Sequence, residues 1–319
     1  MEFQDPVYGR QKVEEKVLQE LVESEPVQRL KNVNQAGTAH FMDKPAVTRF
    51  QHSLGVMFLL RSHGAPLEEQ IAGLLHDVPH TAFSHVADFI FRNKEHEYHE
   101  RFMEQIVFDS RIPEILERHG FDVDYILDES NFLLLERDIP DLCADRIDYF
   151  LRDTTVYGHE DLSHLRSGLA VVDDLFVLEN EEVGERYALK YIESDERYWA
   201  HPKEVAIFEI FARALRRAME IGLIEEEDLF GTDRELLEKV NGSEDPVVRE
   251  NMEMLQNGLE IQVGGDDYDF IGETKPRYVD PQVLKNGELV RISELSERVA
   301  ERIEEHEEEV GSGYKISII

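Results

Sequence analysis

The sequence predicts a mainly α-helical protein whose last part, from about residue 171, is a smaller α+β region. In the first 170 residues, apolar side chains recur three and four positions apart, which is the period of one helix face. After about residue 170, short β-prone runs and turn residues alternate with helical segments. A chain of 319 residues with 41% hydrophobic content can bury a substantial core.

The first part contains several predicted helices. In residues 12–31, Val13, Val17 and Leu21 follow a helical spacing that ends near a proline, after which a second helix begins. Residues 48–61 are apolar on most faces, which predicts a buried helix. Further helices are predicted at residues 67–78, 99–107 and 139–151.

The second part mixes strands and helices. Residues 175–178 and 187–192 are β-prone runs separated by a polar segment, which predicts a β-hairpin. Residues 202–221 predict a long amphipathic helix, and residues 233–240 a shorter one. Beyond residue 241, turn signals such as Lys275-Pro276 become frequent. An acidic run at 304–309 is typical of a solvated helix end, and residues 314–319 predict a final strand.

Composition excludes several classes of protein. No stretch approaches the ~18 uninterrupted apolar residues of a membrane span, and the N-terminus lacks a basic patch followed by an apolar run. We therefore expect a cytoplasmic protein without a membrane partner. Cys143 is the only cysteine, which excludes an intramolecular disulfide and a cysteine-based zinc site. Any metal must be held by histidine and carboxylate.

The net charge of −35 is spread along the whole chain. Such a surface repels nucleic-acid backbones at ordinary salt, so a nucleic-acid partner is not expected. An acidic excess with few lysines is typical of a halophilic protein, because molar salt screens charges over ~3 Å. The alternative is an acidic protein from an ordinary environment.

Four polar residues interrupt predicted buried helices. His76 and Asp77 end one apolar helix, His52 lies on another, and Asp145 interrupts a third apolar pattern. Two imidazoles and two carboxylates suit one or two divalent metal ions, such as Mn, Fe, Mg, Co or Zn. Taken singly, a buried histidine is more often a satisfied core residue, and a His-Asp pair often occurs by chance.

Three ordered motifs give these residues a context: RFQHSLGV at 49–56, IAGLLHDVPHTAFSH at 71–85 and DRIDYFLRD at 145–153. They resemble the HD superfamily of phosphohydrolases, and within it the dNTP triphosphohydrolase branch that includes the human sterile-alpha-motif/HD-domain dNTPase. The resemblance implies an HD-type catalytic domain at 1–170 with a helical core. The α+β extension at 171–319 would complete the substrate pocket with its helix at about 202–221.

The resemblance also implies roles for single residues. It makes His52, His76, Asp77 and Asp145 the metal ligands. His85 would be the general acid that protonates the leaving oxygen, with Asp88 and His99 supporting it. His80 would be a further histidine of the active site. The alternative is that His80, His85 and His99 are ordinary polar residues of a turn.

The resemblance also implies residues that bind the substrate, but several of them have other possible roles. The resemblance assigns phosphate binding to Arg49 and Arg146, and sugar binding to Gln35, Tyr149 and Asp153. Tyr149 could equally be a core aromatic, and Asp153 a surface salt-bridge partner. Arg213 is a further candidate for phosphate binding, although arginines on a helix face are more often solvated or paired with acids.

Two positions depart from the family pattern. Ala36 follows Gln35 where the dNTPase relatives have leucine, and Met219 corresponds to the tyrosine that crowds the sugar 2′ position in the human enzyme. Both changes bear on discrimination against ribonucleotides.

The leading hypothesis is metal-dependent hydrolysis of (deoxy)nucleoside triphosphates to nucleoside and triphosphate by a homo-oligomeric enzyme. The first alternative is another nucleotide phosphohydrolase, a nucleotidase or phosphodiesterase that would not need polyphosphate clamps. From a different class, the protein could be a nucleotide sensor without turnover. A nuclease is disfavoured by the acidic charge.

Overall fold

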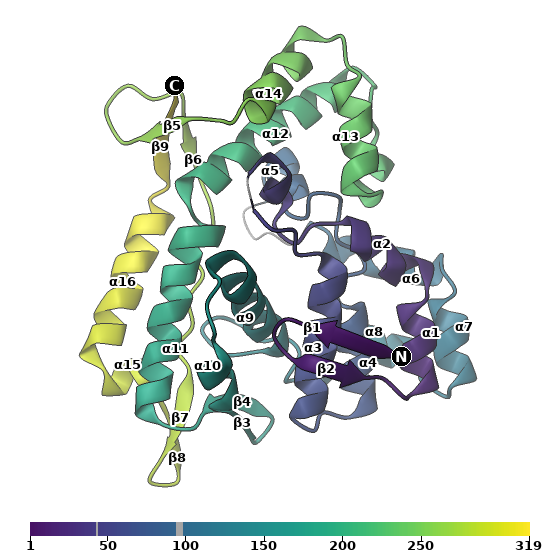
Figure 1. Ribbon diagram of the computed structural model, residues 1–319, viewed down its shortest axis with the longest axis vertical. Helices are drawn as coiled ribbons and strands as arrows, with labels where there is room; N and C mark the ends of the chain where they lie inside the picture. The colour runs from purple at the N-terminus through teal and green to yellow at the C-terminus, as the bar shows by residue number, and fades with distance from the viewer. Residues whose placement is uncertain (43, 94–97) are drawn as a thin grey trace.

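The computed structural model describes residues 1–42, 44–93 and 98–319, and in these ranges the chain is mainly helical, as predicted. Figure 1 shows helices on either side of the long helix α9 (Ala144–Gly158) and a further group at the top of the view. The helices before α9 are α1 (Lys16–Val22), α2 (Glu25–Arg29), α3 (Arg49–Ser62), α4 (Leu67–Leu75), α5 (Val86–Phe91), α6 (Met103–Phe108), α7 (Ile112–Arg118) and α8 (Val123–Leu127). An N-terminal hairpin of β1 (Glu2–Asp5) and β2 (Gly9–Lys12) packs beside them.

The remaining elements form the C-terminal part. Its helices are α10 (Ser163–Ser167), α11 (Glu181–Ser194), α12 (Pro202–Glu220), α13 (Asp233–Asn241), α14 (Pro246–Gln256), α15 (Ile292–Leu295) and α16 (Glu297–Gly311). One four-stranded sheet has the order β3 (Leu169–Val172), β4 (Leu175–Leu178), β7 (Gln282–Lys285), β8 (Glu288–Arg291). A three-stranded sheet has the order β5 (Ile261–Val263), β9 (Tyr314–Ile318), β6 (Phe270–Gly272).

Helix α3 is the buried helix that the sequence predicts at residues 48–61. Thr48 and Gln51 form a capping box at its start, where each side chain accepts from the other's backbone N–H. The helix packs against both α4 and α9. Gly55 allows the close approach of α9, because a Cβ there would lie 2.0 Å from Arg152 Nη2 and 2.1 Å from Asp148 Oδ1.

Several helix boundaries differ from the sequence prediction. Helix α4 ends at Leu75, and α9 begins at Ala144 rather than near residue 139. The predicted helix at 99–107 is a 3₁₀ turn, Glu100–Phe102, followed by α6. The predicted helices at 202–221 and 233–240 and the final strand at 314–319 are confirmed as α12, α13 and β9.

The predicted hairpin of residues 175–178 and 187–192 is wrong. The first run is strand β4, but it pairs with the preceding strand β3. The second run lies inside helix α11, whose N-terminus is capped by Asn180. Tyr187 and Tyr191 are four positions apart, so they lie on the same face of the helix, and both are fully buried. The packing of this face outweighs the β-propensity of the two residues.

Two hydrophobic clusters make the core, and each draws residues from both sides of position 170. The first joins α3, α4 and α9 to α11 and the β4–β7 sheet. The second joins the Ala82–Ile90 segment to α12, α13, α14 and β9. Among the described residues, no helix is both long enough and apolar enough to cross a membrane.

Candidate metal centre and active site

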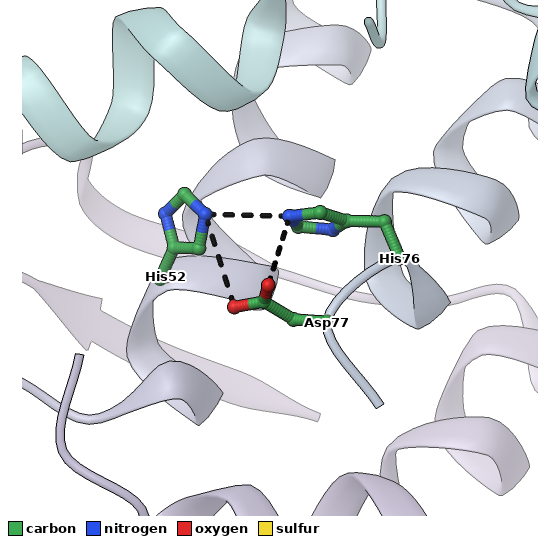
Figure 2. A group of neighbouring side chains, drawn as sticks. All are labelled: His52, His76 and Asp77. Atoms are coloured by element: carbon green, nitrogen blue, oxygen red, sulfur yellow. Dashed lines mark hydrogen bonds and ion pairs between the residues drawn. The ribbon is translucent and has the colours of Figure 1, made fainter. Parts of the chain in front are cut away.

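Three of the four predicted metal ligands form a compact group (Figure 2). His52 comes from α3, His76 follows the last residue of α4, and Asp77 is next along the chain. His52 Nε2 and His76 Nε2 are 3.3 Å apart, and they lie 3.9 and 3.6 Å from the carboxylate oxygens of Asp77. One nitrogen or oxygen of each residue therefore faces a common point.

Asp145, the fourth predicted ligand, enters from the first turn of α9. Its Oδ1 atom lies 2.8 Å from His52 Nε2 and 3.4 Å from His76 Nε2. The side chain is 25% exposed, more than those of His52 and Asp77, so Asp145 lies on the open side of the group.

The outer nitrogens of both imidazoles are also fixed. His52 Nδ1 lies 2.8 Å from Asp148 Oδ2, and His76 Nδ1 lies 2.8 Å from the carbonyl oxygen of Gly73. Asp148 in turn accepts two hydrogen bonds from Arg152, which also donates to Asp5 of the N-terminal hairpin. In the neutral rings, Nδ1–H donation to these acceptors would leave both Nε2 lone pairs directed at the shared point, which is how metal-binding histidines are commonly oriented.

The electrostatics of the group suit a cation. Burial lowers the pKa of His52, but its hydrogen bonds with Asp145 and Asp148 outweigh burial and raise that pKa to about 10. Burial acts against ionisation of Asp77, yet Arg49 and the neighbouring histidines hold its pKa below the usual value. The carboxylates therefore stabilise positive charge between them. Two imidazole nitrogens and two carboxylates fit a divalent metal ion.

The predicted active-site histidines lie beside this group. His80 Nε2 is 3.3 Å from Asp77 Oδ1, and its ring stacks on that of His99 with centroids 3.5 Å apart. His85 Nδ1 lies 3.1 Å from Asp88 Oδ2. Asp88 thus pairs directly with His85, while His99 stacks on His80.

Burial is the main cause of the lowered pKa of each of these histidines. It lowers the pKa of His80 and His85 well below the usual value, and Arg49 lowers both further. Burial likewise lowers the pKa of His99 to about 3. Protonation of His85 therefore requires more negative charge than the neighbouring carboxylates supply.

The turn that carries His80 and His85 is held from elsewhere in the chain. Phe83 and Ser84 adopt positive φ angles of 57° and 50°, a conformation that costs about 1–3 kcal/mol per non-glycine residue. Asp233, at the start of α13, accepts from the Phe83 backbone N–H at 2.7 Å and from that of Asn34 at 2.9 Å. No pattern within residues 71–85 indicates this distant anchor.

The two predicted phosphate-binding arginines differ in how they are held. Arg49 donates to both Asp77 oxygens at 3.1 Å and to Ser84 Oγ at 2.9 Å, and its Nη2 lies 3.4 Å from His85 Nε2. Arg146 donates to the Asp141 carbonyl at 2.7 Å and to the Arg137 carbonyl at 3.1 Å. Both arginines line the pocket, but neighbouring groups already occupy much of the Arg146 guanidinium.

The predicted sugar-binding residues line the same pocket. Asp153 is 2% exposed and accepts from Trp199 Nε1 at 2.8 Å. Its other oxygen and Gln35 Oε1 have no hydrogen-bond partner among the described residues. Tyr149 forms a hydroxyl contact with Tyr191 and packs edge-on against Trp199.

Two residues on α12 lie outside the pocket lining. Arg213 pairs with Glu209 at 3.3 Å and lies over the ring of Phe270. Met219 packs against the second hydrophobic cluster instead of facing the sugar-binding residues. The residues of α12 that line the pocket, Glu204, Val205 and Phe208, lie at its N-terminal end, and the substrate role of Arg213 stays a prediction.

Several residues that line the pocket were not predicted from the sequence. Trp199 belongs to the π-helical turn Asp195–Trp199, and Lys275 and Arg277 to the loop after β6. The single tryptophan of the chain was the one available signal, since its indole N–H needs a partner when buried. Lys275-Pro276 indicates a turn but not its place in the fold.

Comparisons with known proteins identify the family. An HD domain matches residues 49–153. The metal-dependent phosphohydrolase Cns2 of Cordyceps militaris is 34% identical over 298 residues, which cover 90% of this chain and 86% of that protein. The chain therefore belongs to the HD-domain family of metal-dependent phosphohydrolases.

Other relatives extend this picture. YdhJ of Bacillus subtilis is 37% identical over 324 residues, which cover 100% of this chain and 99% of YdhJ. The deoxynucleoside triphosphate triphosphohydrolase SAMHD1 of Gallus gallus is 30% identical over 161 residues, or 43% of this chain and 24% of SAMHD1. A phosphohydrolase structure from Bacteroides thetaiotaomicron shares the fold, with a TM-score of 0.72 at 19% identity, covering 99% of this chain and 98% of that one.

Proposed function

We propose that this protein hydrolyses (deoxy)nucleoside triphosphates to nucleoside and triphosphate. The observation that carries the proposal is Asp153, whose buried carboxylate has one oxygen on Trp199 and one without a partner among the described residues. It lines the same pocket as the histidine and aspartate group that fits a metal ion. A sugar hydroxyl is a donor that would satisfy the second oxygen, because buried polar atoms are normally hydrogen-bonded.

Each group of pocket residues would have its own role in the proposed reaction. His52, His76, Asp77 and Asp145 would hold a divalent cation, which lowers the pKa of a bound water and withdraws charge from phosphorus. Arg49 would bind a phosphate oxygen beside His85. The negative charge of that phosphate would raise the pKa of His85, so that the ring, oriented by Asp88, could protonate the leaving oxygen.

The contacts of Arg146 support a second candidate function, the hydrolysis of nucleotides with shorter phosphate chains. Its guanidinium donates to two backbone carbonyls and lies 3.1 Å from Cys143 Sγ, which leaves fewer N–H groups for a polyphosphate. Such an enzyme would use the same metal ligands.

Product analysis separates the two candidates. The purified enzyme is incubated with each dNTP and NTP in the presence of Mn, Fe, Co or Mg, at low and molar salt, and phosphorus NMR identifies the products. We expect inorganic triphosphate and free nucleoside. If monophosphate or orthophosphate is the only phosphorus product, the triphosphohydrolase proposal is wrong. An Arg49→Ala variant that loses activity on triphosphates while retaining it on monophosphates would support the proposal.

The domain organisation, the cellular location and the oligomeric state of the protein are also proposals. We infer an HD-type catalytic domain at 1–170 and an extension at 171–319, and the pocket-lining residues Glu204, Val205 and Phe208 support a role for α12 in substrate binding. We also propose a cytoplasmic location, because no stretch of the sequence approaches the ~18 apolar residues of a membrane span. A homo-oligomer follows from the family resemblance, and light scattering after size-exclusion chromatography measures it.

A further inference from the structure

The loop after β6 brings two cations to the pocket from the C-terminal part of the chain. Lys275 and Arg277 line the same cavity as His85 and Tyr149. Burial lowers the pKa of His85 most, and the charges of Arg49 and Arg277 lower it further. Burial raises the pKa of Tyr149, and the charges of Arg146 and Arg277 oppose that rise. The Arg277 charge therefore acts on both the histidine group and the sugar-binding side.

Lys275 and Arg277 make fewer short hydrogen bonds within the protein than Arg49 and Arg146 do. The Arg277 guanidinium has two long contacts, 3.5 Å to the Lys275 carbonyl oxygen and 3.9 Å to Asp195 Oδ1. Among the described residues, no carboxylate forms an ion pair with Lys275 within 4.0 Å. An anion entering the pocket could therefore bind both side chains without breaking a short hydrogen bond. Arg49 and Arg146, by contrast, already donate at 2.7–3.1 Å.

A buried carboxylate anchors the loop. Asp195, in the π-helical turn between α11 and α12, is fully buried, and its Oδ2 accepts the Arg277 backbone N–H at 2.9 Å. The same oxygen lies 2.8 Å from Nε2 of the buried His306 on α16. Pro276 restricts the backbone immediately before Arg277. The backbone of Arg277 is thus tied to this turn and, through His306, to α16.

We propose that Lys275 and Arg277 bind the phosphate chain of the substrate, and that Asp195 positions Arg277 for this role. The assignment deepens the proposed function and rests on it for the identity of the substrate as a nucleoside triphosphate. A guanidinium presents paired N–H donors that match phosphate oxygens, and an ammonium adds a point charge. Because a monophosphate lacks the outer phosphates, these residues would distinguish long from short phosphate chains.

Binding of inorganic tripolyphosphate tests the assignment without turnover. Metal-free enzyme in a chelating buffer is titrated calorimetrically with tripolyphosphate, and separately with a nucleoside monophosphate. For Arg277→Gln and Lys275→Gln we expect the Kd of tripolyphosphate to rise about 10-fold each, since each removes a charge-assisted contact. The Kd of the monophosphate should change less than about 2-fold. Equal affinities of wild type and Arg277→Gln for tripolyphosphate would overturn the assignment.

Two further variants complete the experiment. Arg298→Gln removes an arginine of α16 that is 75% exposed and pairs with Glu185, so it controls for the general loss of positive charge. Asp195→Asn should weaken tripolyphosphate binding several-fold and leave monophosphate binding intact, and a thermal melt checks its folding. Equal losses for both ligands in a folded Asp195→Asn protein would reject its positioning role.

The outcome is separable from that of the proposed function. If wild type releases only monophosphate from dGTP while Arg277→Gln still loses tripolyphosphate binding, the proposed reaction fails and the loop assignment stands. If triphosphate is released but the variants bind tripolyphosphate like wild type, the loop assignment fails and the proposed reaction stands.

Discussion

The two sides of the pocket differ in how their side chains are held. On the metal-binding side, His52 is fully buried and has carboxylates at both ring nitrogens. On the side formed by the loop after β6, Lys275 and Arg277 are partly exposed, and the Arg277 guanidinium has only long contacts. The first arrangement orients groups before any ligand arrives, and the second leaves charge available for a ligand. The candidate metal ligands are therefore held more firmly than the two cations of the loop.

This difference follows the connectivity of the chain. The metal-binding side is built by α3, the end of α4 and the first turn of α9, which pack together in the first hydrophobic cluster. The other side consists of a helical turn and a loop joined by Asp195. Loops carry fewer packing contacts than helices, so substitutions there should change binding more than stability.

The largest effect is expected from a metal ligand. His76→Gln should reduce kcat/KM by about 10³-fold, because a metal ion contributes several kcal/mol to transition-state stabilisation. Metal content by mass spectrometry should fall with activity. The matched control is His119→Gln, which removes a histidine that pairs with Glu20 away from the pocket. Full activity and full metal content in His76→Gln would remove His76 from the ligand set.

The second prediction concerns the pH dependence of stability at Asp153. Burial raises the pKa of this carboxyl to about 6, although the hydrogen bond from Trp199 opposes the rise. Well below about pH 4 the group is protonated in both folded and unfolded protein, so its contribution to stability is fully present. Between about pH 4 and pH 6 the unfolded state releases the proton more easily than the folded state, so the free energy of unfolding falls, and above about pH 6 the loss is complete.

Asp153→Asn removes this titration. Its free energy of unfolding relative to wild type should therefore improve by about 2–3 kcal/mol between pH 4 and pH 8. Denaturant unfolding of both proteins at several pH values measures the difference. The comparison isolates Asp153 from Asp233, whose pKa burial also raises to about 6, because Asp233 is present in both proteins. A difference that does not change with pH would contradict the prediction.

The smallest effect is expected at Arg213. This side chain pairs with Glu209 and lies over Phe270, outside the pocket lining. Arg213→Gln should change kcat/KM by less than about 2-fold and stability by about 0.5–1 kcal/mol, the size of an exposed cation–π contact. Steady-state kinetics beside Arg277→Gln give the comparison. A loss of triphosphate affinity in Arg213→Gln equal to that in Arg277→Gln would return Arg213 to the substrate site.

The helical class, the HD family and the candidate metal ligands can all be predicted from the sequence alone. His52, His76, Asp77 and Asp145 lie in or next to motifs whose apolar neighbours form local helices, so that a polar residue stands out against its own segment. Residues 187–192 show the limit of local propensity, because burial against α9 makes them helical.

Other residues of the pocket could not be predicted from the sequence and depend on the tertiary structure. Trp199, Lys275 and Arg277 have no local pattern that indicates a site, and they reach the pocket through contacts far apart in sequence. Asp233 anchors the histidine turn from 150 residues away, and Asp195 joins Arg277 to α16. Buried hydrogen bonds of this kind depend on which segments the two hydrophobic clusters bring together. The spacing of apolar residues within one segment indicates its secondary structure but not the segment it will contact.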